Sequence, residues 1–228
     1  MKRIVLFFTF IVLSFVVVSQ NCENFIPTTV GTKVTTEHYD KKDKLSSSVV
    51  TEIKSVDIVD GKQKVVVATE SFDKKGVSTG TQELIYYCNG DVFEIDTKSM
   101  LDNSQLAAYE TMQIDYSFDN LQYPSNLSAG MKLKDGFVEA VISNEGIKMM
   151  TLRVDVKDAK VDAIESITVP AGTYEAAKIS QTLVTKTGFI TTEMQSVQWM
   201  VKDIGAVRTE TYNKNGKLMG YSIVAKVE

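Results

Sequence analysis

Histidine, tryptophan, proline and cysteine are all scarce in this chain of 228 residues, which has one histidine, one tryptophan, three prolines and two cysteines. The single histidine, His38, has no second imidazole with which to form a histidine-based zinc site. The two cysteines form no CxxC pair, so the sequence does not indicate a thiolate metal site or a reactive thiol pair. No stretch rich in proline, glycine or serine marks a linker, which favours a single domain.

Positive charge is present mainly as lysine and is spread along the sequence. The net charge is −4 at pH 7, and loss of Lys2 and Arg3 with a signal peptide makes it −6. A nucleic-acid-binding protein needs a concentrated basic face, and the linear sequence shows none. Mild acidity favours solubility and argues against binding to anionic membrane surfaces.

The N-terminus has the layout of a secretory signal peptide. Lys2 and Arg3 precede an apolar run over residues 4–18, and the polar residues 19–21 end that run just before Cys22. This layout predicts a signal peptide over residues 1–20 and one exported, β-rich domain over residues 21–228. The expected location is the periplasm or the cell exterior.

Two alternatives to a cleaved signal peptide fit less well. A transmembrane helix needs about 20 apolar residues, and this run is shorter and lacks a charged stop-transfer flank. A bacterial lipoprotein needs a small residue directly before the cysteine, whereas Asn21 occupies that position. Cleavage after Ser19 or Gln20 is therefore expected, with no stable membrane insertion of the mature chain.

The two cysteines are expected to pair because the chain is exported. A disulfide between Cys22 and Cys88 would join the mature N-terminus to the end of an apolar run. It would close a loop of about 65 residues and stabilise the fold by roughly 4 kcal/mol in the chain-entropy model.

Alternating apolar and polar residues predict an all-β fold. Residues 151–157 place Leu152, Val154 and Val156 on one face, and turn signals such as Asp60-Gly61 and Asn89-Gly90 recur along the chain. We expect a single antiparallel meander sheet of about ten strands, curved or a half-barrel. One short helix is predicted over residues 99–112, and residues 115–135 are predicted to be irregular.

The C-terminal half carries the motifs of a known family. These are ITVPAGTYEAAK at residues 167–178, QWMV at 198–201, IGAVR at 204–208 and NGKL at 215–218, with YPS at 123–125 upstream. The layout resembles an uncharacterised family of exported, TapB-like proteins from Bacteroidota, labelled a domain of unknown function. The resemblance implies an antiparallel sheet similar to a half-barrel of periplasmic lipoprotein carriers. It implies no activity, cofactor or catalytic residue.

The candidate sites for chemistry are weak. A Ser–His–Asp triad would need His38, which lies in an expected strand, and the chain has no Gly-x-Ser-x-Gly motif. Glu94 and Asp96 alternate beside a turn, as on a solvated sheet face. The series Asp155, Asp158 and Asp162 lacks the glycine and terminal glutamate of a calcium loop. We therefore expect no enzyme activity, no metal and no cofactor.

Methionine content suggests a binding surface. Met149, Met150, Met194 and Met200 lie in or beside expected strands, and flexible methionine side chains are common at adaptable apolar surfaces. The same residues could instead fill gaps in the core, where Trp199 is expected as an anchor. Arg208 is expected on the solvated face, opposite Val207. The leading hypothesis is a non-enzymatic protein that binds an apolar or peptide ligand on a concave sheet face. The alternative is a structural or assembly partner in the cell envelope that uses an open sheet edge or loop.

Overall fold

A computed structural model describes residues 25–101, 106, 109 and 111–228, and these form one antiparallel sheet of thirteen strands with a short 3-10 helix, η1 (Thr97–Met100). The strands are β1 (Lys33–Asp40), β2 (Leu45–Val59), β3 (Lys62–Asp73), β4 (Ser78–Asn89), β5 (Val92–Ile95), β6 (Gln113–Asp119), β7 (Leu121–Pro124), β8 (Gly136–Asn144), β9 (Ile147–Val169), β10 (Gly172–Thr187), β11 (Ile190–Val201), β12 (Gly205–Asn213) and β13 (Leu218–Val227).

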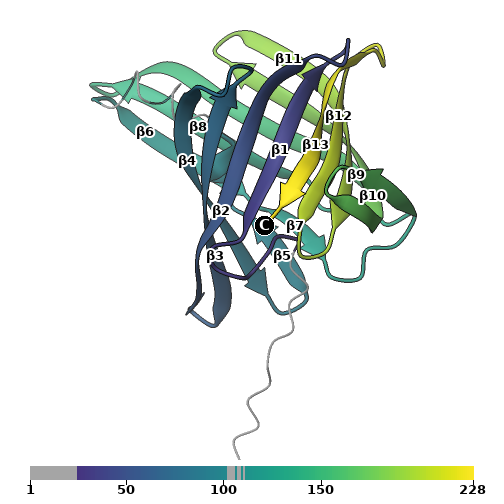
Figure 1. Ribbon diagram of the computed structural model, residues 1–228. Helices are drawn as coiled ribbons and strands as arrows, with labels where there is room; N and C mark the ends of the chain where they lie inside the picture. Colours follow the sequence, from purple (N-terminus) through teal and green to yellow (C-terminus); the bar gives the residue numbers. More distant parts are fainter. Residues whose placement is uncertain (1–24, 102–105, 107–108, 110) are drawn as a thin grey trace, which may run out of the picture.

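The sheet is a meander that nearly closes into a barrel (Figure 1). The first and last strands, β1 and β13, pair at its centre, with β2 to β5 following on one side and β12 to β8 on the other. The two edge strands, β6 and β7, are separated by Asn120 alone. One continuous segment therefore pairs with β8 at one edge and then with β5 at the other. The expected curved, all-β sheet is confirmed.

Tight hairpins explain why the strands follow one another so closely. Asp60 and Gly61 both have positive φ, 52° and 76°, and Glu145 and Gly146 repeat the pattern at 50° and 79°. Two consecutive residues with positive φ give the turn whose twist matches that of the flanking strands. Asp-Gly tolerates this conformation, as the sequence indicated.

The structure corrects one expectation for the middle of the chain. Residues 115–135 were expected to be irregular, yet they include most of β6 and all of β7. Ile114, Tyr116 and Phe118 alternate with polar residues and pair with β8. This alternation has the same period as the other strands, but aromatic residues rather than valine carry it.

The expected helix over residues 99–112 is tested only in part. The 3-10 helix η1 begins at Thr97, two residues before the expected start, and Leu106 is helical. Residues 102–105, 107–108 and 110 of the expected helix lie outside the described residues. The buried Thr97 hydroxyl donates to the Phe137 carbonyl oxygen (3.1 Å), which ties η1 to β8.

Strand connectivity assigns every hairpin turn to one of two ends of the sheet. The β1–β2, β3–β4, β8–β9, β10–β11 and β12–β13 turns lie at one end, because neighbouring strands alternate in direction and β1 is antiparallel to β13. Figure 1 shows that this end is the wider one. We call it the wide end. The β2–β3, β4–β5, β9–β10 and β11–β12 turns and the start of β1 belong to the opposite, narrow end.

The main hydrophobic cluster fills the inner face of the sheet toward the narrow end. Phe25 packs edge-on against Phe93, with ring centroids 5.8 Å apart, and Tyr86 stacks on Phe93 at 5.5 Å. Other buried members come from strands far apart in sequence: Ile53, Val65, Val67, Leu121, Tyr123, Val156, Val161, Ala177, Ile179 and Met200.

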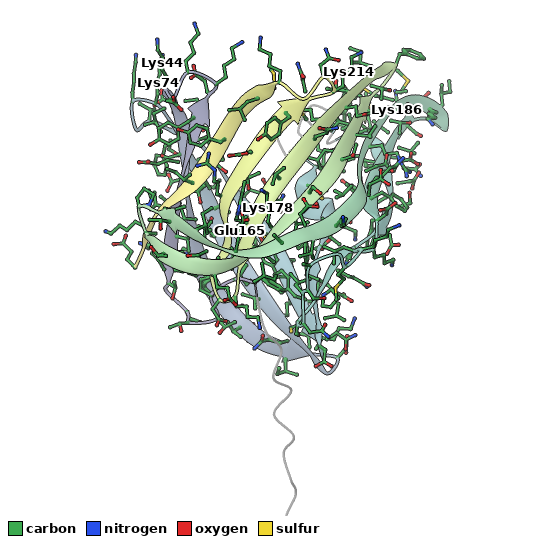
Figure 2. The ribbon with its side chains drawn as sticks, turned by 90° about the vertical axis from the view of Figure 1, so that its right-hand side faces the viewer. Lys44, Lys74, Glu165, Lys178, Lys186 and Lys214 are labelled. Carbon is green, nitrogen blue, oxygen red and sulfur yellow. The ribbon has the colours of Figure 1, made fainter. Side chains whose placement is uncertain are left out.

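A second cluster lies where the β9–β10 hairpin crosses neighbouring strands (Figure 2). Trp199 Nε1 donates a 2.7 Å hydrogen bond to Glu165 Oε1, and the Ala171 amide reaches the Val224 carbonyl oxygen at 3.4 Å. Trp199 is 8% exposed, so its expected role as a core anchor is confirmed. Glu165, which interrupts an apolar alternation in the sequence, is thus the hydrogen-bond acceptor of this anchor.

Candidate functional site

A pocket of about 390 Å³ opens at the narrow end, between the β9–β10 hairpin, the end of β11 and the loop after β7. Its apolar lining consists of Phe25, Leu127, Ile164, Ala176, Ala177 and Met200. Its polar lining consists of Ser125, Asn126, Glu175 and Lys202. The volume is within the range of small-molecule sites, roughly 300–1,000 Å³.

Backbone geometry brings the floor of this pocket together. Gly205, at the start of β12, has φ of 109°, and a Cβ there would lie 3.2 Å from the Phe25 carbonyl oxygen. Only glycine combines this conformation with so close an approach. The register then pairs Ala177 with both Met200 and Ile164. Segments separated by more than 100 residues thus meet in one pocket.

The pocket has an apolar interior and a polar mouth. Phe25, Ala177 and Met200 are at most 6% exposed, whereas Ile164 is 42% exposed. Glu175 and Lys202, at the mouth, are both exposed. Such a site suits a molecule with an apolar body and a charged or hydrogen-bonding end.

The phenols deep in the narrow end stay neutral. Burial raises the pKa of Tyr86 to about 12. The pKa of Tyr123 is also raised to about 12, mainly by burial and to a smaller extent by the nearby Tyr86. Neither phenol supplies a base near neutral pH, so these two residues contribute packing rather than acid–base chemistry.

A second pocket, of about 400 Å³, has a more polar lining. Ser180, Thr182, Gln195, Val197 and Tyr212 line it and share one sheet face, the face that carries Trp199. Gln181 also lines it, and the buried Oε1 of this residue has no hydrogen-bond partner among the described residues. This pocket suits water or a hydrogen-bonding ligand better than an apolar one.

His38 lies on β1, at the centre of the sheet rather than on an edge strand. The expected position was at the surface or at a strand edge; pairing of the two terminal strands excludes the edge, because it places β1 between β13 and β2, and the His38 side chain is half-buried. Burial lowers the pKa of His38. Among the described residues, no three His, Cys, Asp or Glu side chains gather as a metal site would require.

The acidic candidates have structural partners. Glu94 accepts from Gln122 Nε2 (3.2 Å), and Asp96 caps η1. Asp155 binds the guanidinium of Arg153 at 2.7 Å, and the hydrogen bond and charge of that group lower the pKa of Asp155 despite its burial. Asp158 has a positive φ of 55° beside a register shift of β9. These carboxylates are therefore spread over separate structural contacts.

The candidate binding residues divide between core and surface. Met200 lies in the main cluster and lines the narrow-end pocket. Met150 is partly buried, Met149 is 58% exposed and Met194 is partly buried on β11. Arg208 lies opposite the buried Val207, but its face is not a solvated one, because it also carries the buried Trp199. Its half-buried guanidinium lies 4.8 Å from the Tyr221 ring centroid and contacts Glu210 at 2.7 Å.

The N-terminal predictions fall outside the described part of the chain. The signal peptide, residues 1–20, and Cys22 are not among the described residues. Cys88 is 1% exposed near the narrow end of β4, and its pairing with Cys22 stays a prediction. No helix within the described ranges is long and apolar enough to span a membrane.

The sequence analysis missed the grouping of lysines at the wide end. They look scattered along the chain, but the residues linking strands at the wide end include Lys41, Lys42, Lys44, Lys74, Lys75, Lys214 and Lys217. The sequence did contain a signal for this clustering, because every second turn of a meander lies at the same end of the sheet. The lysine-rich turns alternate along the chain with Asp60-Gly61 and Asn89-Gly90.

Comparisons with known proteins agree with this architecture. A protein from Bacteroides fragilis, named as exported and with a YmcC-like fold, has a TM-score of 0.71 at 20% identity, covering 91% of this chain and all of its own. A protein from Parabacteroides distasonis, named as a lipoprotein, has a TM-score of 0.74 at 24% identity, covering 92% and all of its own. At these identities the likeness shows the fold. No curated protein matches the chain.

The family prediction is confirmed in its general form. Residues 29–224 match the family described as DUF3108-like, a domain of unknown function. The narrower TapB-like relationship and the similarity to lipoprotein carriers stay predictions. Because the match extends over most of its length, the chain belongs to the DUF3108-like family.

Proposed function

We propose that this chain is an exported, non-enzymatic binding protein that holds the apolar part of a small amphipathic ligand in the narrow-end pocket. The observation that carries this proposal is the combination of the apolar walls formed by Phe25, Ala177 and Met200 with Lys202 and Glu175 at the mouth. The inner face is otherwise filled by side chains toward the narrow end, so the ligand would enter beside Ile164 rather than lie across the whole concave face.

Export is part of the proposal. The layout of residues 1–20 supports it, and the two similar structures, named as an exported protein and a lipoprotein, are in keeping with it. Cleavage at the expected position would leave Phe25, which lines the pocket, within the mature chain.

Native mass spectrometry of the mature protein purified from the periplasm tests the proposal. A lipid-sized adduct that dissociates in organic solvent is the expected result, with titration of laurate as a defined probe. The variant Ile164→Trp should weaken laurate binding by roughly tenfold or more, since an indole at the mouth fills the entrance. Ile58→Trp on β2, where Ile58 is 72% exposed, is the matched control.

Two outcomes would overturn the proposal. One is a clean apo mass with no laurate binding by the unmodified protein. The other is equal laurate binding by the unmodified protein and the Ile164→Trp variant, which would place the ligand elsewhere.

The alternative role, as an assembly partner in the envelope, has support from a different region. Large apolar side chains are exposed on the wide-end turns, including Phe189 and Ile147. Exposed apolar groups in one region are typical of docking surfaces. Co-purification of a stoichiometric protein with a clean apo mass would favour this role.

A further inference from the structure

Lysine side chains surround the wide end of the sheet. Figure 2 shows Lys44, Lys74, Lys186 and Lys214 at this end. Lys186 lies near the end of β10, and the other three lie on turns from both halves of the chain. The linking residues of the five wide-end turns include seven lysines and two acidic residues, Asp43 and Glu145. The four narrow-end turns have the opposite bias, with Lys202 against Asp60, Asp91 and Asp203. Asp40 and Asp73 end β1 and β3 beside these turns, so the wide end has seven lysines against four carboxylates. The wide end is therefore net positive, although the chain as a whole is acidic.

The wide-end lysines are available to an external partner. No ion pair within the described part of the chain involves any of the seven linking lysines or Lys186. Toward the narrow end the lysines behave differently, since Lys54 lies 2.7 Å from Glu52 and Lys62 lies 3.8 Å from Glu94. Toward the narrow end these two lysines have glutamate partners within 4 Å. At the wide end, Asp40 and Asp73 accept hydrogen bonds from backbone amides of the β1–β2 and β3–β4 turns, and neither forms an ion pair with a linking lysine among the described residues.

Exposed apolar side chains accompany these lysines. Val77 is 60% exposed, Ile147 68%, Phe189 106% and Met219 49%. They come from the β3–β4, β8–β9, β10–β11 and β12–β13 turns respectively, at or beside the turn in each case. Isolated exposed apolar residues need no explanation, but four turns at one end that each present one form a recurrent arrangement.

Lysines and apolar tips together match the chemistry of one partner, an anionic lipid surface. Apolar side chains insert at the boundary of headgroups and acyl chains, while lysines attract anionic headgroups. We propose that the wide end docks reversibly onto an anionic bilayer through these turns, with the strands standing away from the membrane. The proposal is independent of the narrow-end pocket. The net charge alone argued against binding to anionic membranes, but the lysines are concentrated at one end of the sheet.

Vesicle co-sedimentation of the mature protein, with signal removal checked by N-terminal sequencing, tests the docking. Binding is expected to vesicles of phosphatidylethanolamine and phosphatidylglycerol, with little binding to phosphatidylcholine alone. It should weaken as salt rises, because salt screens exposed charges. The double variant Lys74→Gln/Lys75→Gln should reduce partition by roughly tenfold or more, and Phe189→Ser/Ile190→Ser should also reduce it.

A control with the same change in net charge separates position from total charge. Val30→Asp/Ile58→Asp lowers the net charge by two, as the lysine variant does, but at narrow-end positions that are 60% and 72% exposed. This control should bind vesicles like the unmodified protein. Absence of vesicle binding would overturn the proposal, as would equal losses in this control and in the lysine variant. Retained laurate binding by the lysine variant would show that docking and the pocket are separate.

Discussion

Phe93 and Phe189 illustrate how differently the two ends of this molecule use the same side chain. Phe93 is 1% exposed at the narrow end and contacts two other aromatic rings, whereas Phe189 protrudes from a wide-end turn with full exposure. The ends also differ in charge, since lysines near the narrow end pair with glutamates and the wide-end lysines lack such partners among the described residues. The narrow end is thus organised for packing and the wide end for contact with an external surface.

The largest expected effect tests this comparison with one substitution at each end. Phe93→Ala should destabilise the fold by about 3–5 kcal/mol, because it removes buried apolar area and leaves a cavity. Phe189→Ala should change the free energy of unfolding by less than about 0.5 kcal/mol, as exposed positions do. Urea unfolding followed by Trp199 fluorescence measures both, and similar losses at the two ends would contradict the comparison.

The predicted disulfide gives the next largest effect and concerns the narrow end. If Cys22 pairs with Cys88, Cys22→Ser should lower the free energy of unfolding by about 2–4 kcal/mol. Reduction of the unmodified protein should produce the same loss, and reduction of the variant none. Alkylation that detects two free thiols in the unreduced protein would contradict the pairing.

Paired charges should contribute more to stability than the wide-end lysines do. Asp155→Asn should cost about 1 kcal/mol at neutral pH, since it weakens the half-buried contact with Arg153. The pKa of Asp155 is lowered in the folded state, so the stabilisation is complete above the unfolded value of about 3.9 and is lost as pH falls through the lower folded value. The gap between the two proteins should therefore close in acid.

Unfolding measured at a series of pH values checks this prediction. Asp119→Asn is a suitable control, because Asp119 and Lys134 form an exposed pair and such pairs contribute little. A gap between the Asp155 variant and the unmodified protein that widened in acid would contradict the assigned direction.

The smallest expected effect is that of the wide-end lysines on folding. Lys74→Gln/Lys75→Gln should change the free energy of unfolding by less than about 0.5 kcal/mol, because neither side chain has an ion-pair partner in the described structure. A larger loss would show that these lysines stabilise the turn rather than serve an external surface. Thermal unfolding of the double variant beside the unmodified protein provides the measurement.

Local patterns predicted the architecture more reliably than the site. The alternation of Leu152, Val154 and Val156 and the Asp60-Gly61 turn report on neighbouring residues, so they indicated antiparallel strands correctly. The pocket was not predictable in the same way. It joins Phe25, Leu127, Ile164 and Met200, whose proximity depends on strand order and on register shifts such as the one between Lys178 and Ile179.

The sequence by itself determined that this protein is an antiparallel all-β domain, because strand alternation and turn chemistry act over a few residues. Tertiary structure decided which turns share an end, since the pairing of β1 with β13 is a contact between the two halves of the chain. That pairing gathers lysines that look dispersed in sequence into one end of the sheet. Tertiary packing likewise brings Phe25 against Phe93 of β5 and Tyr123 of β7, in the narrow-end core beside the pocket.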